Sequence, residues 1–86
     1  MVSKKFIMKN KNGMPVRSAQ SLANSMDRFS SDIKIKTEGK ETNGKSFIGI
    51  MAADIKYGRG FEVSCKGADE EAMLSEACNI IESSFN

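Results

Sequence analysis

The chain has 86 residues, with a formal net charge of +2, 40% hydrophobic and 28% charged residues. Because it has no histidine, Ser-His and Cys-His nucleophilic catalysis, histidine acid–base chemistry and most zinc sites are excluded, and we do not expect an enzyme. The 13 basic residues nearly balance the 11 acidic residues, so the net charge does not indicate nucleic-acid binding.

Localisation follows from three absences in the sequence. The longest apolar run, Phe47 to Ala53, is far shorter than the roughly 20 residues that span a bilayer. No apolar block follows the N-terminal lysines, so we expect no signal peptide. Cys65 and Cys78 lack a CxxC spacing and are interpreted as small core residues. We therefore expect a cytoplasmic protein without a metal or cofactor, and no repeat or linker divides residues 1–86 into more than one domain.

The first elements are a strand and a helix. Phe6 and Met8 are two residues apart within Val2 to Lys9, which favours a strand, and a turn follows at Asn12-Gly13.

From Val16 the apolar residues recur at intervals of three and four, which predicts a helix with one buried face. Pro15 precedes this helix, at a position where the missing N–H costs nothing. The apolar residues of this face are Ala19, Leu22, Ala23, Met26 and Phe29.

Two strands and a short helix come next. Asp32 to Thr37 alternates polar and apolar residues, which predicts a half-buried strand with both isoleucines inward. Turn signals flank a short strand around Lys40 to Thr42. Ser46 is a natural N-cap for a short helix. That helix would contain Phe47, Ile50, Met51 and Ile55.

The last part of the chain predicts one strand and one helix. Phe61 to Lys66 alternates in the same way as Asp32 to Thr37. Asp69 is expected to cap the final helix, with Glu70 and Glu71 near its positive end. The expected core stripe of this helix is Met73, Leu74, Ala77, Cys78, Ile81 and Phe85.

This order of elements predicts an α+β fold. It is an open-faced β-sandwich, in which a four-stranded antiparallel sheet carries three helices on one face (βαββαβα). The pattern alone does not separate this fold from a ferredoxin-like domain.

Four segments resemble one known family. They are Gly13 to Ala19 (GMPVRSA), Gly39-Lys40, Lys45 to Met51 (KSFIGIM) and Gly67 to Glu70 (GADE). The sequence is similar over essentially its whole length to HPr, the small phosphocarrier of the bacterial sugar phosphotransferase system. The segment around Lys45 and Ser46 is the most specific of the four, and the family fold is the open-faced β-sandwich described above.

The resemblance also defines a departure from the family. HPr phosphocarriers have a histidine where this chain has Pro15, and a proline where it has Ser18. That histidine accepts phosphate from enzyme I and passes it to sugar-specific acceptors. Proline has no side-chain nucleophile, and a phosphate ester on Ser18 would be too stable for a relay. The resemblance therefore implies a member of the family that has lost its carrier role.

Ser46 has two interpretations, a plain N-cap and a phosphorylation site. In HPr proteins of low-GC Gram-positive bacteria, HPr kinase phosphorylates the serine at this place, and the product binds a LacI-type catabolite control regulator. A histidine-less relative with that role, the catabolite repression HPr, has glutamine in place of the histidine. A phosphate of about −1.5 to −2 charge is favourable at a helix N-terminus. We predict that Ser46 is phosphorylated and regulates binding.

A partner-binding surface is expected around the same residues. Phe47, Ile48 and Met51 cannot all face the core from a two-turn helix, so at least one apolar side chain should face solvent. Arg17 is either a solvated residue of the first turn or a contact for an anion, and Gln20 is a weaker candidate. Enzyme I, the kinase and the regulator are the partners that the resemblance implies for this surface.

The sequence leaves two other functions open. One is a degenerate HPr fold that acts as an unswitched interaction module or a decoy for HPr partners. The other is a ferredoxin-like RNA-binding domain, which is disfavoured because only Phe61 could stack on a base. No apolar seam is evident, so we expect a monomer.

Overall fold

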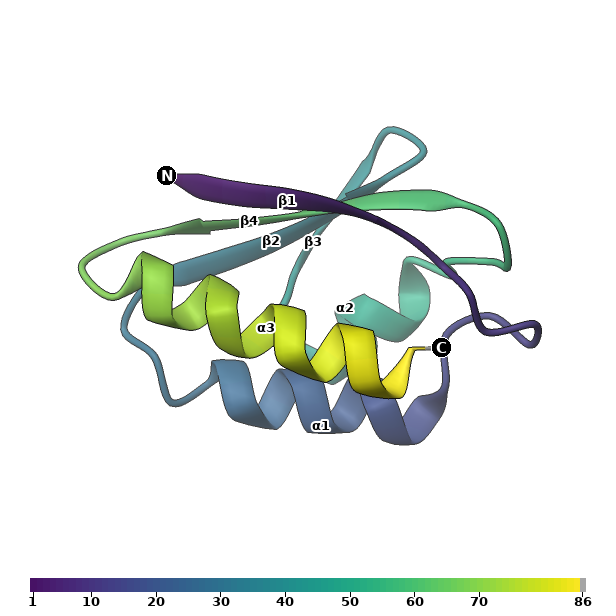
Figure 1. Ribbon diagram of the computed structural model, residues 1–86, viewed down its shortest axis with the longest axis horizontal. Helices are drawn as coiled ribbons and strands as arrows, with labels where there is room; N and C mark the ends of the chain where they lie inside the picture. Colours follow the sequence, from purple (N-terminus) through teal and green to yellow (C-terminus); the bar gives the residue numbers. More distant parts are fainter. Residues whose placement is uncertain (86) are drawn as a thin grey trace.

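A four-stranded antiparallel sheet covered on one face by helices forms the molecule (Figure 1), and the computed structural model describes residues 1–85. The elements in chain order are β1 (Val2–Ile7), α1 (Val16–Met26), β2 (Asp32–Thr37), β3 (Lys40–Asn43), α2 (Phe47–Ala52), β4 (Gly60–Lys66) and α3 (Glu70–Ser84). The strand order is β1-β4-β2-β3, with every neighbouring pair antiparallel. The predicted α+β architecture and element order are confirmed.

Two central strands, β2 and β4, supply the sheet's buried side chains. Ile35 and Val63 are direct cross-strand partners, and they expose 1% and 0% of their surface. Their neighbours along each strand point to the opposite face, where Lys34 and Lys36 are exposed as predicted. Burial of each aliphatic side chain stabilises the fold by about 1.5–3 kcal/mol, which fixes the register of the sheet.

The core lies between this sheet and the helices, and α1 and α3 are side by side over it (Figure 1). Leu22, Met26 and Met73 are fully buried there. The ring of Phe61 bridges the sheet and α3, because its centroid lies 5.4 Å from that of Phe6 and 6.2 Å from that of Phe85. No helix within residues 1–85 has the length and apolar character needed to cross a bilayer.

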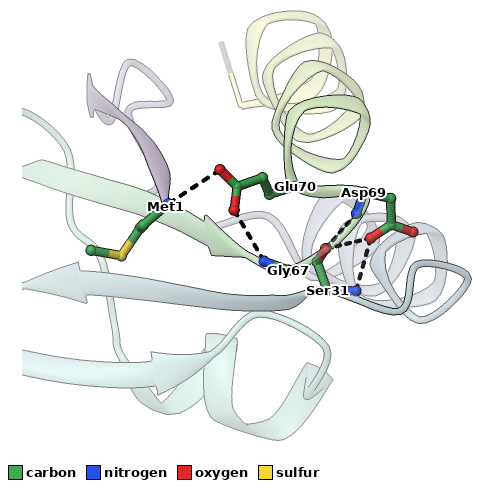
Figure 2. A network of polar contacts seen from close by, with 5 residues as sticks. All are labelled: Met1, Ser31, Gly67, Asp69 and Glu70. Atoms are coloured by element: carbon green, nitrogen blue, oxygen red, sulfur yellow. Dashed lines mark hydrogen bonds and ion pairs between the residues drawn. The ribbon is translucent and has the colours of Figure 1, made fainter.

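The start of α3 differs from the prediction that the Asp69 side chain caps this helix. Asp69 occupies the N-cap position, but its carboxylate makes no capping bond to the helix. It accepts hydrogen bonds from the backbone N–H groups of Ser30 and Ser31 at 3.1 and 2.9 Å, and a third from the Ser31 hydroxyl. The Ser31 hydroxyl accepts the Asp69 N–H at 3.1 Å (Figure 2). The carboxylate therefore ties α3 to the segment before β2.

Gly67 and Glu70 complete this contact between α3 and the segment before β2. Gly67 has a φ of +149°, and a Cβ on it would lie 2.7 Å from the Ser31 Cα. Only glycine fits so close an approach. The Glu70 carboxylate accepts the Gly67 N–H at 3.1 Å and lies 3.2 Å from the Met1 amino group (Figure 2).

Some predicted core residues differ from the prediction in their element or their burial. Phe29 and Ile55 lie beyond their predicted helices, because α1 ends at Met26 and α2 at Ala52. Phe29 is half-buried, whereas Ile55 is 2% exposed and belongs to the core as predicted. Leu74 and Cys78 are half-buried, since α3 turns only a narrow stripe toward the sheet. Cys65 is fully buried, as predicted, and burial raises the pKa of its thiol to about 11.

Candidate functional site

The candidate site is the surface formed by α1, α2 and the residues that cap their N-termini, which we call the α1–α2 surface. It contains Pro15, Arg17, Gln20, Ser46, Phe47, Ile48 and Met51. The two helices pack against each other, so residues far apart in the sequence share this part of the molecule.

Pro15 is the N-cap of α1. Its backbone is extended, with φ −71° and ψ 134°, and its carbonyl accepts the Ala19 N–H at 3.0 Å. The proline ring fixes a φ compatible with this position, and the residue gives up no helical hydrogen bond there. Pro15 thus begins the helix well but presents no side-chain nucleophile.

A tight turn holds Pro15 in place. The Gly13 N–H donates to the Asn10 carbonyl at 2.9 Å, and Gly13 has a φ of +80°, as predicted for a turn. A Cβ on Gly13 would lie 3.1 Å from the Ile55 carbonyl oxygen. The turn is therefore packed directly against the segment that follows α2.

Ser18 lies one turn into α1 and exposes 8% of its surface. Its hydroxyl donates to the carbonyl of Ser84 at 3.0 Å. The hydroxyl nearest to Pro15 in the helix is thus buried, and it joins α1 to the end of α3.

Arg17 and Gln20 are both exposed on α1. The neighbouring Val16 exposes 57% of its surface, so the start of α1 presents apolar and cationic groups together. Such a surface suits a partner that brings both an apolar contact and an anion.

Ser46 is the N-cap of α2, as predicted. Its hydroxyl accepts the Gly49 N–H at 3.0 Å, its carbonyl accepts the Ile50 N–H at 2.9 Å, and the residue is half-buried. Gly49 is required at this point, because a Cβ there would lie 3.2 Å from the Ser46 hydroxyl and would collide with the Thr42 hydroxyl. Helix α2 therefore approaches β3 closely at Gly49, the residue whose N–H Ser46 accepts.

Lys45 connects the two helices, a contact that the sequence did not reveal. Its ammonium donates to the Phe29 carbonyl just beyond α1 at 2.7 Å. Its backbone N–H donates to the Asn43 side chain at 2.9 Å. The residue before Ser46 thus anchors the start of α2 to the end of α1.

The apolar part of the surface agrees with the expectation of an exposed side chain on α2. Ile48 exposes 78% of its surface, whereas Phe47 and Met51 are half-buried and Ile50 is buried. Met51 also lines a hollow of about 370 Å³ together with Met14 and Tyr57. Neither Met14 nor Tyr57 was predicted for the site. Within residues 1–85, no group of three or more Cys, Asp or Glu side chains could hold a metal ion.

Comparisons with known proteins decide the family. Residues 2–83 match the family model described as the PTS HPr component phosphorylation site. The phosphocarrier protein HPr of Borreliella burgdorferi is 35% identical over 83 residues, which cover 96% of each chain. This chain belongs to the HPr family.

Two solved structures of the family are similar throughout. The histidine-containing phosphocarrier protein of a mycoplasma superposes with a TM-score of 0.93, at 28% identity over 98% of this chain and 97% of that one. The catabolite repression protein Crh of Bacillus subtilis, described as a dimer with a swapped domain, has a TM-score of 0.76 at 28% identity, covering 96% and 95%.

The mycoplasma protein is described as histidine-containing, and this HPr-family chain differs from it in that feature. None of its 86 residues is histidine, and the start of α1 holds Pro15. HPr proteins are phosphocarriers rather than catalysts, and the α1–α2 surface of this member contains one hydroxyl, one guanidinium and several apolar groups.

Proposed function

We propose that this HPr-family protein acts by binding protein partners without carrying phosphate, and that phosphorylation of Ser46 regulates the binding. The observation that carries the first part is Pro15 at the start of α1 in a chain without histidine. A phosphoramidate relay needs a side-chain nitrogen, and proline has none to offer. Ser18 does not replace it, because its hydroxyl is buried and bonded to the Ser84 carbonyl.

The position of Ser46 supports the second part. The half-buried hydroxyl caps α2 two residues before Ile48, the most exposed large apolar residue of the site. A phosphate there would add about −1.5 to −2 charge beside an apolar contact. The phosphate would therefore directly change the electrostatic potential of the α1–α2 surface. By similarity to the family, the kinase is HPr kinase and the bound partner is a LacI-type catabolite regulator.

One observation favours a second candidate, the unswitched interaction module. The Ser46 hydroxyl already serves a structural purpose as the acceptor for the Gly49 N–H. In that case Arg17, Gln20, Phe47, Ile48 and Met51 would bind enzyme I or another HPr partner without any modification.

Mass spectrometry separates these candidates. With ATP and HPr kinase we expect the protein to gain one phosphate, and Ser46→Ala to gain none. Ser75→Ala, a change to an exposed serine on α3, is the matched control and should be phosphorylated normally. With enzyme I and phosphoenolpyruvate we expect no phosphate. Labelling by enzyme I would refute the loss of the carrier role, and an unmodified Ser46 with retained partner binding would favour the unswitched module.

A gain-of-function variant tests whether only the acceptor is missing. We expect Pro15→His, combined with Ser18→Pro, to accept phosphate from enzyme I if the docking surface is intact. Pro15→His alone should be made as well, because it keeps the bond between Ser18 and the Ser84 carbonyl. Failure of both folded variants to be labelled would show that docking to enzyme I is also lost.

The monomeric state expected from the sequence stays a prediction, since Crh of Bacillus subtilis is a dimer in its crystal structure. Analytical ultracentrifugation of the unmodified protein would settle it.

A further inference from the structure

The outer edge of β1 is a row of backbone groups that face away from the sheet. β1 is the terminal strand in the order β1-β4-β2-β3. At its end, the Met8 N–H donates to the Arg59 carbonyl at 2.9 Å, on the side of β4. Because bonded residues alternate along an antiparallel pair in continuous register, the N–H and C=O groups of Ser3, Lys5 and Ile7 point to the free edge. Such an edge can pair with a further strand.

Side chains on the open face form a row of alternating charge that ends at this edge. Lys5 on β1 is opposite Glu62 on β4, Glu62 is opposite Lys36 on β2, and Lys36 is opposite Glu41 on β3. Lys36 and Glu41 form an ion pair at 3.4 Å. Opposite charges directly across a strand pair stabilise a sheet. The next position beyond Lys5 in this row therefore favours a carboxylate.

The helix side of the same edge is also basic, with an apolar floor. A groove of about 570 Å³ between β1 and α3 is lined by residues that include Lys4, Lys9, Phe6 and Phe85. The Lys4 ammonium lies 3.1 Å from the Glu82 carboxylate and 5.3 Å from the centre of the Phe6 ring. An incoming strand would meet lysines on both of its faces and apolar contacts beside them.

The charges argue against a second copy of this chain as the occupant. An antiparallel pairing of two β1 strands through their outward groups would bring Lys5 of one copy opposite Lys5 of the other, or, shifted along the strand, Lys4 opposite Lys4. Like charges directly opposite destabilise a strand pair, and edge lysines are a common device against self-pairing. The same lysines attract a strand of opposite charge.

We propose that the free edge of β1 binds an acidic peptide segment in extended conformation. The segment adds an antiparallel fifth strand, with Glu or Asp opposite Lys5 and a second acidic residue opposite Lys4. Backbone bonds to Ser3, Lys5 and Ile7 supply the pairing, the lysines select the charge, and the groove beside Phe6 accepts an apolar side chain.

The first test uses the peptide acetyl-Val-Val-Glu-Glu-Thr-Val-amide and the ¹⁵N-labelled full chain. We expect NMR shift changes centred on β1 and slower hydrogen exchange at the amides of Ser3, Lys5 and Ile7. A matched peptide with both Glu replaced by Lys should not bind. The proposal is overturned if about 1 mM of the acidic peptide produces no change, if the changes map to the α1–α2 surface, or if the Lys peptide binds equally well.

Two further pairs of reagents test the geometry and the charge. N-methylation of the first Glu, whose N–H would face Lys5, should abolish binding, whereas N-methylation of the second Glu, whose N–H would face away, should not.

Lys5→Glu should weaken binding about tenfold, while the matched variant Lys40→Glu, an exposed change on the other edge strand β3, should bind normally. Equal binding by both protein variants, or by both methylated peptides, would contradict the proposal. Ser46→Ala should bind the peptide normally, so this test is independent of the proposed phosphorylation.

Discussion

Two serine hydroxyls accept hydrogen bonds at the starts of helices in this protein, but their surroundings differ. Ser46 accepts the N–H of Gly49 at 3.0 Å, three residues away in the chain, and the residue is half-buried. Ser31 accepts the N–H of Asp69 at 3.1 Å, 38 residues away, and it is 1% exposed. The first contact is local and leaves the residue half-buried on the α1–α2 surface, while the second joins two distant parts of the fold. The same chemical group therefore makes a local cap at one helix, where we propose that it also regulates recognition, and a tertiary contact at the other.

Gly67→Ala should break the tertiary contact most severely. The new Cβ would meet the Ser31 Cα at 2.7 Å, and the φ of +149° is unfavourable for alanine. We expect a loss of about 3 kcal/mol in the free energy of unfolding, measured by urea denaturation. Gly58→Ala is the matched control, because Gly58 has a φ of +81° with no atom within 4 Å of a new Cβ. It should cost about 1 kcal/mol, and equal losses in the two variants would show that the approach to Ser31 is not tight.

Acid should weaken the same contact. The hydrogen bond from the Ser31 hydroxyl and those from the backbone of Ser30 and Ser31 lower the pKa of Asp69 to about 2. Its folded pKa thus lies below the unfolded value of about 3.9, so its stabilising effect is complete above about pH 5 and is lost progressively as the pH falls through about 2. Asp69→Asn should be less stable at neutral pH and should lose less stability on acidification.

Thermal denaturation at a series of pH values measures this effect. Ser31→Ala keeps the carboxylate but removes its hydroxyl donor, so its stability should vary with pH less than that of the wild type and more than that of Asp69→Asn. An Asp69→Asn protein with the wild-type pH profile would refute the assignment.

Ser46→Ala should have the smallest effect on stability. Loss of an N-cap hydroxyl costs about 1 kcal/mol, and α2 is only six residues long, so the rest of the fold should remain. Ser46→Asn should restore most of the loss, because its side chain can also cap a helix, yet it cannot be phosphorylated. Urea denaturation of the two variants separates the structural role of Ser46 from its proposed regulatory role. A larger loss in the free energy of unfolding than that of Gly67→Ala would show that the local cap matters more for stability than the tertiary contact.

Local patterns predicted much of the fold. The strands β2 and β4 were predictable because their buried and exposed residues alternate with a period of two. The capping role of Ser46 was predictable because its hydroxyl bonds to an N–H only three residues away. The resemblance to HPr assigned Pro15 and Ser46 to positions of one known family. The match of residues 2–83 to the HPr family model supports that family assignment.

Contacts between distant segments could not be predicted in this way. The role of Asp69 was assigned to its own helix, although its carboxylate binds Ser30 and Ser31, 39 and 38 residues away. The bond from the Lys45 ammonium to the Phe29 carbonyl could not be predicted, because its acceptor is a backbone atom that every residue carries. The hollow beside Tyr57 likewise depends on how the segment after α2 folds back toward Met14.

The two cysteines differ in burial, so their rates of chemical labelling distinguish complete unfolding from local unfolding. Cys65 is completely enclosed, and burial raises the pKa of both thiols above the ordinary value. A thiol-specific dye can reach Cys65 only after the sheet separates from α3, whereas the half-buried Cys78 requires only a local movement of the helix. In a Cys78→Ser protein, the rate at which the dye labels Cys65 would report complete opening of the fold without an engineered cysteine.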